Sequence, residues 1–227
     1  MMQKWPSSIV LVRHGKTIVN IEKERLKEKP TKELYIKTPC RDMDLPITKK
    51  GVSESERTGK ILRKYPKFDV IYVSPYKRAT QTAEIIIKEL GYNPQFILEE
   101  RIREKDFGVF DRLTERGRKK FYPIEAKRKE WEGEYYYRVL GGESYPDVAL
   151  RIHDFLNTLI REYKGKNVLI IAHSLVILMF RKLLERLSEK EVLDLHTNQK
   201  LKNCSISSFI YDKRKNKLRL KEWNRIK

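Results

Sequence analysis

The tripeptide Arg13-His14-Gly15 is the clearest chemical feature of the sequence, because it ends a short apolar run at residues 9–12. A guanidinium matches phosphate oxygens two at a time, and a neutral imidazole is a usable nucleophile near neutral pH. The apolar run predicts a strand, and open α/β sheets bind ligands at the carboxyl ends of their strands. Glycine permits a sharp turn and a close backbone approach, so Gly15 is a candidate substrate-binding residue. The tripeptide predicts phosphate chemistry at a strand end.

Other polar motifs stand at the ends of further apolar runs. Ser74-Pro75-x-x-Arg78 follows the second run and puts Arg78 in the first turn of a helix, whereas Ala172-His173-Ser174 follows residues 168–171 directly. Arginines and histidines gathered at one sheet edge suit a phosphoryl group, whose transfer depends on positioning and positive charge. The remaining motifs are Glu104-Lys105-Asp106-Phe107-Gly108, Gly141-Gly142-Glu143-Ser144 and Asn203-Cys204-Ser205-Ile206.

Taken in this order, the motifs resemble the histidine phosphatase superfamily, also called phosphoglycerate mutase-like, from about residue 9 to about residue 211. The resemblance implies a three-layer α/β/α sandwich and phosphoryl transfer through a phosphohistidine. It casts His14 as the nucleophile and Glu104 as the proton donor. It casts Arg13, Arg78 and His173 as the groups that surround the phosphoryl oxygens.

The state of Glu104 presents a tension. A general acid must start protonated, whereas nearby arginines favour the ionised carboxylate. Burial under a lid or an acidic pH optimum would each resolve the tension, and the sequence does not decide between them. Glu100 is a fallback acid, and a solvated Glu104 is the alternative interpretation.

Three further residues are candidates for substrate binding. Asn20 follows the catalytic tripeptide at the distance where many family members have a phosphate-side asparagine. Arg138 resembles an arginine of several phosphatase-like members and could bind a second anionic group, or it could be a surface arginine. Ser174 stands where many members have glycine, so its side chain could narrow the pocket or donate a hydrogen bond.

The elements that must position these residues alternate between β-rich runs and helical patterns. Strands are expected at 8–13, 69–73, 95–99, 167–172, 204–211 and 217–223. Apolar residues at helical spacing fill 79–90 and 148–163, and Ser144 with Asp147 predicts a capping box at the second of these. This alternation favours a mostly parallel sheet covered on both faces, and a hairpin through 212–216 would give one antiparallel edge strand.

Two stretches interrupt the alternation, at about 22–46 and 109–140, and both are too long for ordinary connections. We expect a single domain over 1–227 in which these insertions either form a lid over the active site or decorate the surface. Three consecutive tyrosines, Tyr135, Tyr136 and Tyr137, could line the leaving-group side or pack the second insertion onto the core.

Composition limits the other possibilities. The chain has a formal net charge of +19, which would attract anionic substrates or nucleic acid, but the basic residues are spread along the chain, and this favours lysines scattered over solvated helix faces as the explanation. Neither the two cysteines, Cys40 and Cys204, nor the four histidines have metal-ligand spacing, and we expect no cofactor and no metal. No apolar run approaches the roughly 20 residues of a membrane span, and no signal peptide is visible, so a cytoplasmic location is expected. His153 and His196 are expected to be structural or surface residues.

These observations favour a metal-independent phosphomonoesterase that acts on a small phosphorylated substrate. The first alternative is a cofactor-dependent phosphoglycerate mutase, which uses the same phosphohistidine. Only residues 109–140 separate Gly108 from Gly141, and this short insertion resembles the phosphatase branch. The second alternative is a non-catalytic basic scaffold or nucleic-acid binder, although nucleic acid is an unlikely partner without a recognisable motif. The oligomeric state is unknown.

Overall fold

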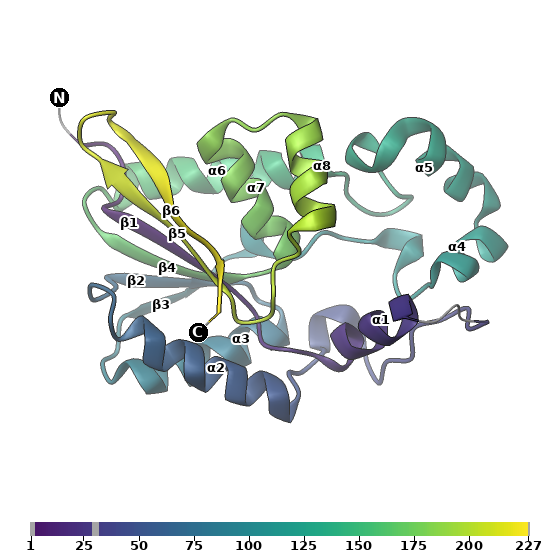
Figure 1. Ribbon diagram of the computed structural model, residues 1–227, viewed down its shortest axis with the longest axis horizontal. Helices are drawn as coiled ribbons and strands as arrows, with labels where there is room; N and C mark the ends of the chain where they lie inside the picture. The colour runs from purple at the N-terminus through teal and green to yellow at the C-terminus, as the bar shows by residue number, and fades with distance from the viewer. Residues whose placement is uncertain (1–2, 29–31, 227) are drawn as a thin grey trace.

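The computed structural model describes residues 3–28 and 32–226, and its centre is a six-stranded sheet (Figure 1). The strand order is β3-β2-β4-β1-β5-β6. The strands are β1 (Ser8–Arg13), β2 (Val70–Val73), β3 (Gln95–Leu98), β4 (Asn167–Ala172), β5 (Ile206–Asp212) and β6 (Lys217–Arg225). All six predicted strands are present, with ends that differ by at most two residues from the prediction.

The sheet is mostly parallel, as predicted. β1, β2, β3 and β4 run in one direction, and β5 runs opposite to both of its neighbours. The predicted hairpin between β5 and β6 is confirmed, but the reversed strand β5 lies one place inside the edge, which β6 occupies. The central strands β1 and β4 are buried on both faces, which explains why they read as continuous apolar runs.

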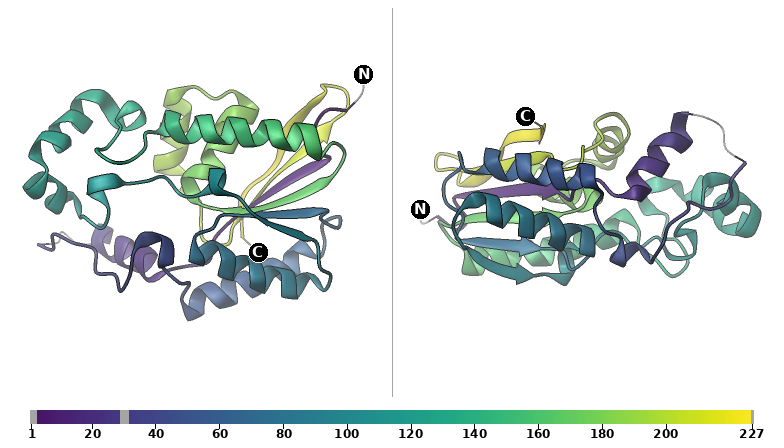
Figure 2. Two further views of the ribbon diagram at one scale, coloured as in Figure 1. Left: turned by 180° about the vertical axis from the view of Figure 1, so that it is seen from behind. Right: turned by 90° about the horizontal axis from the view of Figure 1, so that it is seen from below.

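Helices cover both faces of the sheet, which confirms the predicted α/β/α sandwich (Figure 2). α2 (Lys49–Leu62) and α3 (Lys77–Leu90) lie on one face, and α6 (Tyr145–Glu162) and α7 (Ser174–Glu185) lie on the other, followed by α8 (Glu189–Asn198). Alternate residues of β1 serve the two cores: Ile9 and Leu11 pack on the α6–α7 side, whereas Val10 and Val12 pack on the α2–α3 side. The predicted capping box of Ser144 and Asp147 opens α6.

The two insertions lie beyond the carboxyl edge of the sheet (Figure 1). The first holds most of α1 (Ile18–Glu28) and the 3-10 turn η1 (Asp42–Asp44), and the second holds α4 (Glu115–Phe121) and α5 (Pro123–Tyr136). They bind each other through backbone hydrogen bonds from Ile36 to Arg112 O, at 2.7 Å, and from Thr114 to Leu34 O, at 3.0 Å. The insertions therefore form one layer rather than two separate loops.

Two of the three consecutive tyrosines pack against neighbouring side chains, and none of the three lines the pocket that holds His14. Tyr135 is buried against Tyr145 of α6, and Tyr137 is buried against Phe110, where its hydroxyl donates to Glu125. Tyr136 points to solvent. Of the two interpretations open from the sequence, packing of the insertion is the one that the structure supports.

Within residues 3–28 and 32–226, no helix is long and apolar enough to span a membrane. Nor does any group of three metal-ligating side chains come together in that part of the chain.

Candidate active site

The pairing of β1 with β4 brings the two predicted site histidines together. Arg13 stands in register with Ala172, and the backbone N–H of His14 donates to Ala172 O at 3.0 Å. His14 follows Arg13 and His173 follows Ala172, so the two histidines leave the sheet side by side. Their ring centroids are 5.2 Å apart. Both strands end here, at the edge where open α/β sheets bind ligands.

His14 is held in one tautomer. Its Nδ1 lies 2.8 Å from Gly15 O, and a carbonyl oxygen only accepts, so Nδ1 carries the hydrogen and Nε2 carries the lone pair. The side chain is 3% exposed. Burial, with the positive charges of Arg78 and Arg13, holds the pKa of His14 well below its usual 6.5. The imidazole is therefore neutral at physiological pH.

His173 presents an unused ring nitrogen. Its Nε2 lies 2.8 Å from the Ser74 hydroxyl, whereas its buried Nδ1 has no hydrogen-bond partner among the described residues. Burial, followed by the charge of Arg78, holds the pKa of His173 well below 6.5. The Tyr76 ring packs against the imidazole at 5.2 Å and fixes its orientation.

Two arginines face the histidines. The Nη1 of Arg13 donates to Leu201 O, and its buried Nε has no partner in the described part of the chain. Arg78 lies in the first turn of α3, its side chain only 5% exposed, and its guanidinium stacks over the Tyr76 ring at 4.9 Å. The unpartnered Nε–H of Arg13 and the positive charge of Arg78 in one buried site suit an anion with several oxygens.

Glu104 lies in the same pocket, after the 3-10 turn η2 (Glu100–Ile102). One carboxylate oxygen accepts from the backbone N–H of Lys105 at 2.9 Å. Burial raises the pKa of Glu104 above its ordinary value, although Arg78 and Arg13 oppose the shift. Of the two ways in which Glu104 could be protonated at the start of the reaction, burial is the one that this direction of the pKa favours.

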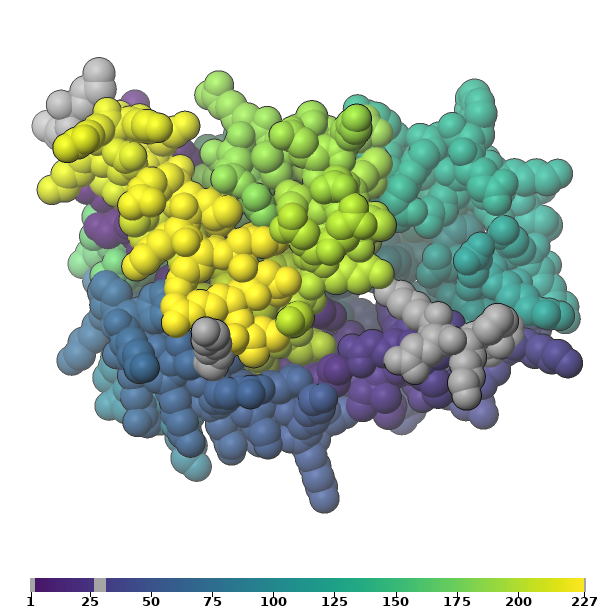
Figure 3. Space-filling view, viewed as in Figure 1, coloured from purple at the N-terminus to yellow at the C-terminus, as the bar shows by residue number. Residues whose placement is uncertain are grey.

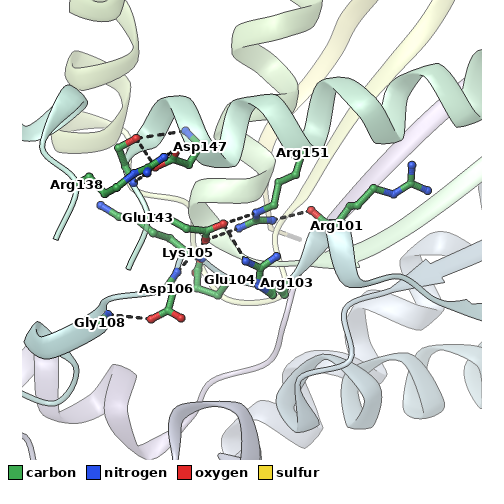
Figure 4. A network of polar contacts seen from close by, with 11 residues as sticks. Arg101, Arg103, Glu104, Lys105, Asp106, Gly108, Arg138, Glu143, Asp147 and Arg151 are labelled. Atoms are coloured by element: carbon green, nitrogen blue, oxygen red, sulfur yellow. Dashed lines mark hydrogen bonds and ion pairs between the residues drawn. The ribbon is translucent and has the colours of Figure 1, made fainter. Parts of the chain in front are cut away.

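Glu143, from the Gly-Gly-Glu-Ser motif, has a structural role. Its carboxylate holds the segment that carries Glu104 in place (Figure 4). It accepts from Arg103 at 3.0 Å and from the backbone N–H of Asp106 at 3.0 Å, and it is itself paired with Arg151 of α6. Glu104 is therefore held between two anchored neighbours.

Arg13, His14, Arg78 and Glu104 line one pocket of about 570 Å³. Figure 3 shows it as a hollow between α8, α1 and the α4–α5 segment. Arg13, His14, Asn20, Arg78, Glu104 and Ser174 are among its lining residues, whereas His173 lies just behind, in contact with His14. The structure thus gathers the five predicted catalytic residues and two predicted substrate-binding residues at one place.

The other two predicted substrate-binding residues lie elsewhere. Gly15 does not line the pocket, and a Cβ at this position would lie 2.7 Å from Gly51 O, so close packing against α2 requires the glycine. Arg138 forms an ion pair with Asp147 and its side chain is 64% exposed, outside the pocket. The interpretation of Arg138 as a surface arginine fits this arrangement.

Several pocket residues were not assigned a role from the sequence. Asn203 donates from Nδ2 to His14 O at 3.0 Å and to Asn20 Oδ1 at 3.2 Å, and its Asn-Cys-Ser-Ile motif was the available signal. Lys23 and Asp42 come from the stretch at 22–46, which has no periodicity to mark them, whereas Lys105 stands in the motif of Glu104 but was given no role of its own. His196, which was expected to be structural or on the surface, lines the outer part of the pocket.

The fold and the pocket define an α/β enzyme of the phosphoglycerate mutase-like class. A model of the histidine phosphatase superfamily (branch 1) matches residues 9–225, so the chain belongs to this superfamily, as its motifs predicted.

Comparison with known proteins finds relatives in sequence and neighbours in fold. The chain is 32% identical over 195 residues to the 2,3-bisphosphoglycerate-dependent phosphoglycerate mutase of Parvibaculum lavamentivorans, a match that covers 84% of this chain and 86% of that protein. A mycobacterial glucosyl-3-phosphoglycerate phosphatase shares the fold with a TM-score of 0.72 at 22% identity, over 96% of this chain and 99% of that one. The α-ribazole phosphatase of Shigella flexneri has a TM-score of 0.76 at 16% identity, over 96% of each chain.

Proposed function

We propose that the protein is a metal-independent phosphomonoesterase that works through a phosphohistidine on His14. The observation that carries the proposal is the neutral His14, whose Nε2 is free, in one buried site with the unpartnered Arg13 Nε and His173 Nδ1. A neutral imidazole lone pair is the nucleophile, and fixed donors around it stabilise the charge that spreads over the phosphoryl oxygens.

The reaction has two steps. His14 Nε2 attacks phosphorus, the P–N bond forms, and the ester P–O bond breaks as Glu104 gives its proton to the leaving oxygen. Water then attacks the phosphohistidine, Glu104 takes the water proton, and the P–N bond breaks to release inorganic phosphate and neutral His14. The raised pKa of Glu104 supports the acid role at the start of this cycle.

Two lysines support a substrate with a second anionic group on its leaving side. Lys105 is 8% exposed, and no carboxylate in residues 3–28 and 32–226 forms an ion pair with it. Its ammonium lies 5.9 Å from the Phe107 ring, and Lys23 approaches the same ring at 5.4 Å. A buried, unpaired cation is costly, and an anion of the substrate would offset that cost.

Residues 22–46 and 109–140 are proposed to act as a lid. Glu24 and Asp42 from the first insertion and Glu134 from the second line the pocket that holds His14. Closing this layer over a substrate would exclude water from the phosphoryl group until the leaving group has been protonated.

A phosphoglycerate mutase is the second candidate, and the sequence relatives favour it. Four relatives that carry this name are 30–32% identical to the chain. Each match covers 83–86% of the relative's length. The short insertion therefore does not by itself separate a phosphatase from a mutase. The difference is whether water or a bound phosphoglycerate accepts the phosphoryl group.

The test is turnover in EDTA with three substrates. These are p-nitrophenyl phosphate, glycerol 3-phosphate and 3-phosphoglycerate, the last assayed with and without 2,3-bisphosphoglycerate. Metal-independent release of phosphate from the esters supports the phosphatase. Interconversion of phosphoglycerates that needs the bisphosphate, with little phosphate release, supports the mutase. Loss of activity in EDTA that added metal restores would overturn the metal-free mechanism, and salt-sensitive nucleic-acid binding without turnover would revive the scaffold.

A further inference from the structure

Asp42 holds the guanidinium of Arg78 at two atoms. Its carboxylate Oδ2 accepts from Arg78 Nη2 at 2.9 Å, and its backbone carbonyl accepts from Nη1. Asp42 belongs to η1 in the first insertion, whereas Arg78 begins α3. A residue of the outer layer therefore fixes the direction of an arginine of the inner site.

This two-point contact sets which N–H groups of Arg78 remain for a ligand. A guanidinium offers five N–H donors in a rigid plane, and holding two of its nitrogens fixes that plane. The Tyr76 ring stacks on the same guanidinium at 4.9 Å and restricts it from the side. Between them, Asp42 and Tyr76 leave Arg78 little freedom to turn away from the pocket.

Asp42 also acts on Glu104, since both carboxylates line the same pocket. Burial makes the largest contribution to the raised pKa of Glu104. The negative charge of Asp42 also raises this pKa, whereas the positive charges of Arg78 and Arg13 lower it. Asp44, in the same 3-10 turn, makes no such contact: it pairs at 2.7 Å with Arg41, and both side chains are exposed.

We propose that Asp42 is a positioning residue for the phosphoryl transfer: it fixes the Arg78 guanidinium and places a negative charge in the pocket that holds Glu104. The inference rests on the proposed function, in which Arg78 binds the phosphoryl oxygens and Glu104 starts as an acid. Because Asp42 lies in the insertion, the outer layer completes the site rather than only covering it.

Other charged and titratable groups also face Glu104, and the Asp42 effect must be separated from theirs. These groups lie on several elements: the end of β1, α1, the start of α3, the residue that follows Glu104, and α6. They are Arg13, Lys23, Tyr76, Arg78, Lys105 and Tyr145. The cations among them lower the pKa of Glu104, so removing the Asp42 charge leaves them unopposed.

The experiment compares Asp42→Asn with Asp44→Asn. Asparagine keeps the backbone contact and a side-chain acceptor for Arg78 but loses the charge. Asp44→Asn removes the same charge from the same turn, outside the pocket. The first readout is the carboxyl pKa of Glu104, measured by ¹³C NMR on glutamate-labelled protein, with Glu104→Gln to assign the signal. The second is kcat/KM for glycerol 3-phosphate and for p-nitrophenyl phosphate.

In Asp42→Asn, we expect the pKa of Glu104 to fall by about one unit. We expect kcat/KM for glycerol 3-phosphate to fall roughly tenfold or more, and that for p-nitrophenyl phosphate to fall less, since its leaving group needs little protonation. Asp44→Asn should match the wild type in both readouts.

An unchanged Glu104 pKa and unchanged turnover in Asp42→Asn would overturn the inference. So would tighter binding of inorganic phosphate by Asp42→Asn with a wild-type pH profile, because Asp42 would then be a competitor for Arg78. The NMR readout does not need turnover. A wild type without phosphatase activity would therefore contradict the proposed function and still leave the role of Asp42 measurable.

Discussion

The imidazole rings of His14 and His173 lie 5.2 Å apart and are tilted by 56°, because each directly follows one of two paired parallel strands. Neither ring has a carboxylate as its hydrogen-bond partner in the described chain: His14 bonds a backbone carbonyl, and His173 bonds the hydroxyl of Ser74. Arg78 is among the groups that lower the pKa of both. The pair is therefore neutral over a wider pH range than isolated histidines would be.

The acid limb of the pH–rate profile follows from this pair. Because the folded pKa of His14 is lowered, its lone pair stays available as the pH falls below 6.5, and turnover is lost only when the pH approaches the lower folded value. We expect kcat/KM for p-nitrophenyl phosphate, corrected for the substrate's own ionisation, to stay level through pH 6.5. A limb at or above pH 6.5 would contradict the neutral pair.

Glu104→Gln should slow phosphoenzyme formation according to the leaving group. Glutamine cannot donate the proton, so we expect a loss of roughly 10²–10⁴-fold for glycerol 3-phosphate and a much smaller loss for the first turnover of p-nitrophenyl phosphate. Rapid-mixing kinetics would measure both first turnovers. Glu100→Gln, at an exposed glutamate four residues earlier, is the matched control and should behave as the wild type. Equal losses for the two substrates would argue against an acid role.

The parts of the site that stand on regular elements were predictable from the sequence. His14 and His173 end apolar strands and Arg78 begins a helix, so the alternation of strands and helices was enough to bring them to one edge. Asp42 was not predictable, because it lies in a charged stretch without periodicity and reaches Arg78 through a contact between distant segments.

Two predicted residues show a second limit of sequence reasoning. The chemistry of Gly15 and Arg138 suits a ligand, but the contacts that the structure gives them are with residues of the protein itself. Gly51 O lies where a Cβ of Gly15 would point, and Asp147 binds Arg138. Neither contact leaves a mark in the local sequence.

Gly15→Ala should destabilise the fold rather than only weaken binding. The added Cβ would lie 2.7 Å from Gly51 O and 3.0 Å from Ser55 Oγ, and relieving such overpacking costs about 1–3 kcal/mol. In a chain of this size each kcal/mol lowers Tm by roughly 2–4 °C. Gly91→Asn is the control, since nothing lies within 4 Å of a Cβ there and asparagine tolerates its left-handed backbone. A Gly15→Ala protein as stable as the control would show that the packing is not tight.

Arg138→Ala should leave substrate selectivity unchanged. The arginine, whose side chain is exposed, pairs with Asp147 in the first turn of α6, and an ion pair with an exposed partner contributes about 0–1 kcal/mol to stability. We expect the ratio of kcat/KM for 3-phosphoglycerate and glycerol 3-phosphate to equal that of the wild type. If the ratio falls in Arg138→Ala, the arginine reaches the substrate after all.

If the phosphoryl group passes through His14, a phosphohistidine forms during turnover and can be trapped. Wild type, Glu104→Gln, His14→Ala and the exposed-histidine control His153→Ala would be mixed with p-nitrophenyl phosphate and quenched in alkali, which preserves phosphohistidine. Peptide mass spectrometry would then locate the phosphate. We expect phosphate on His14 in every protein that keeps this residue, most in Glu104→Gln, and no turnover by His14→Ala. Phosphate on another residue, or wild-type turnover by His14→Ala, would contradict this expectation.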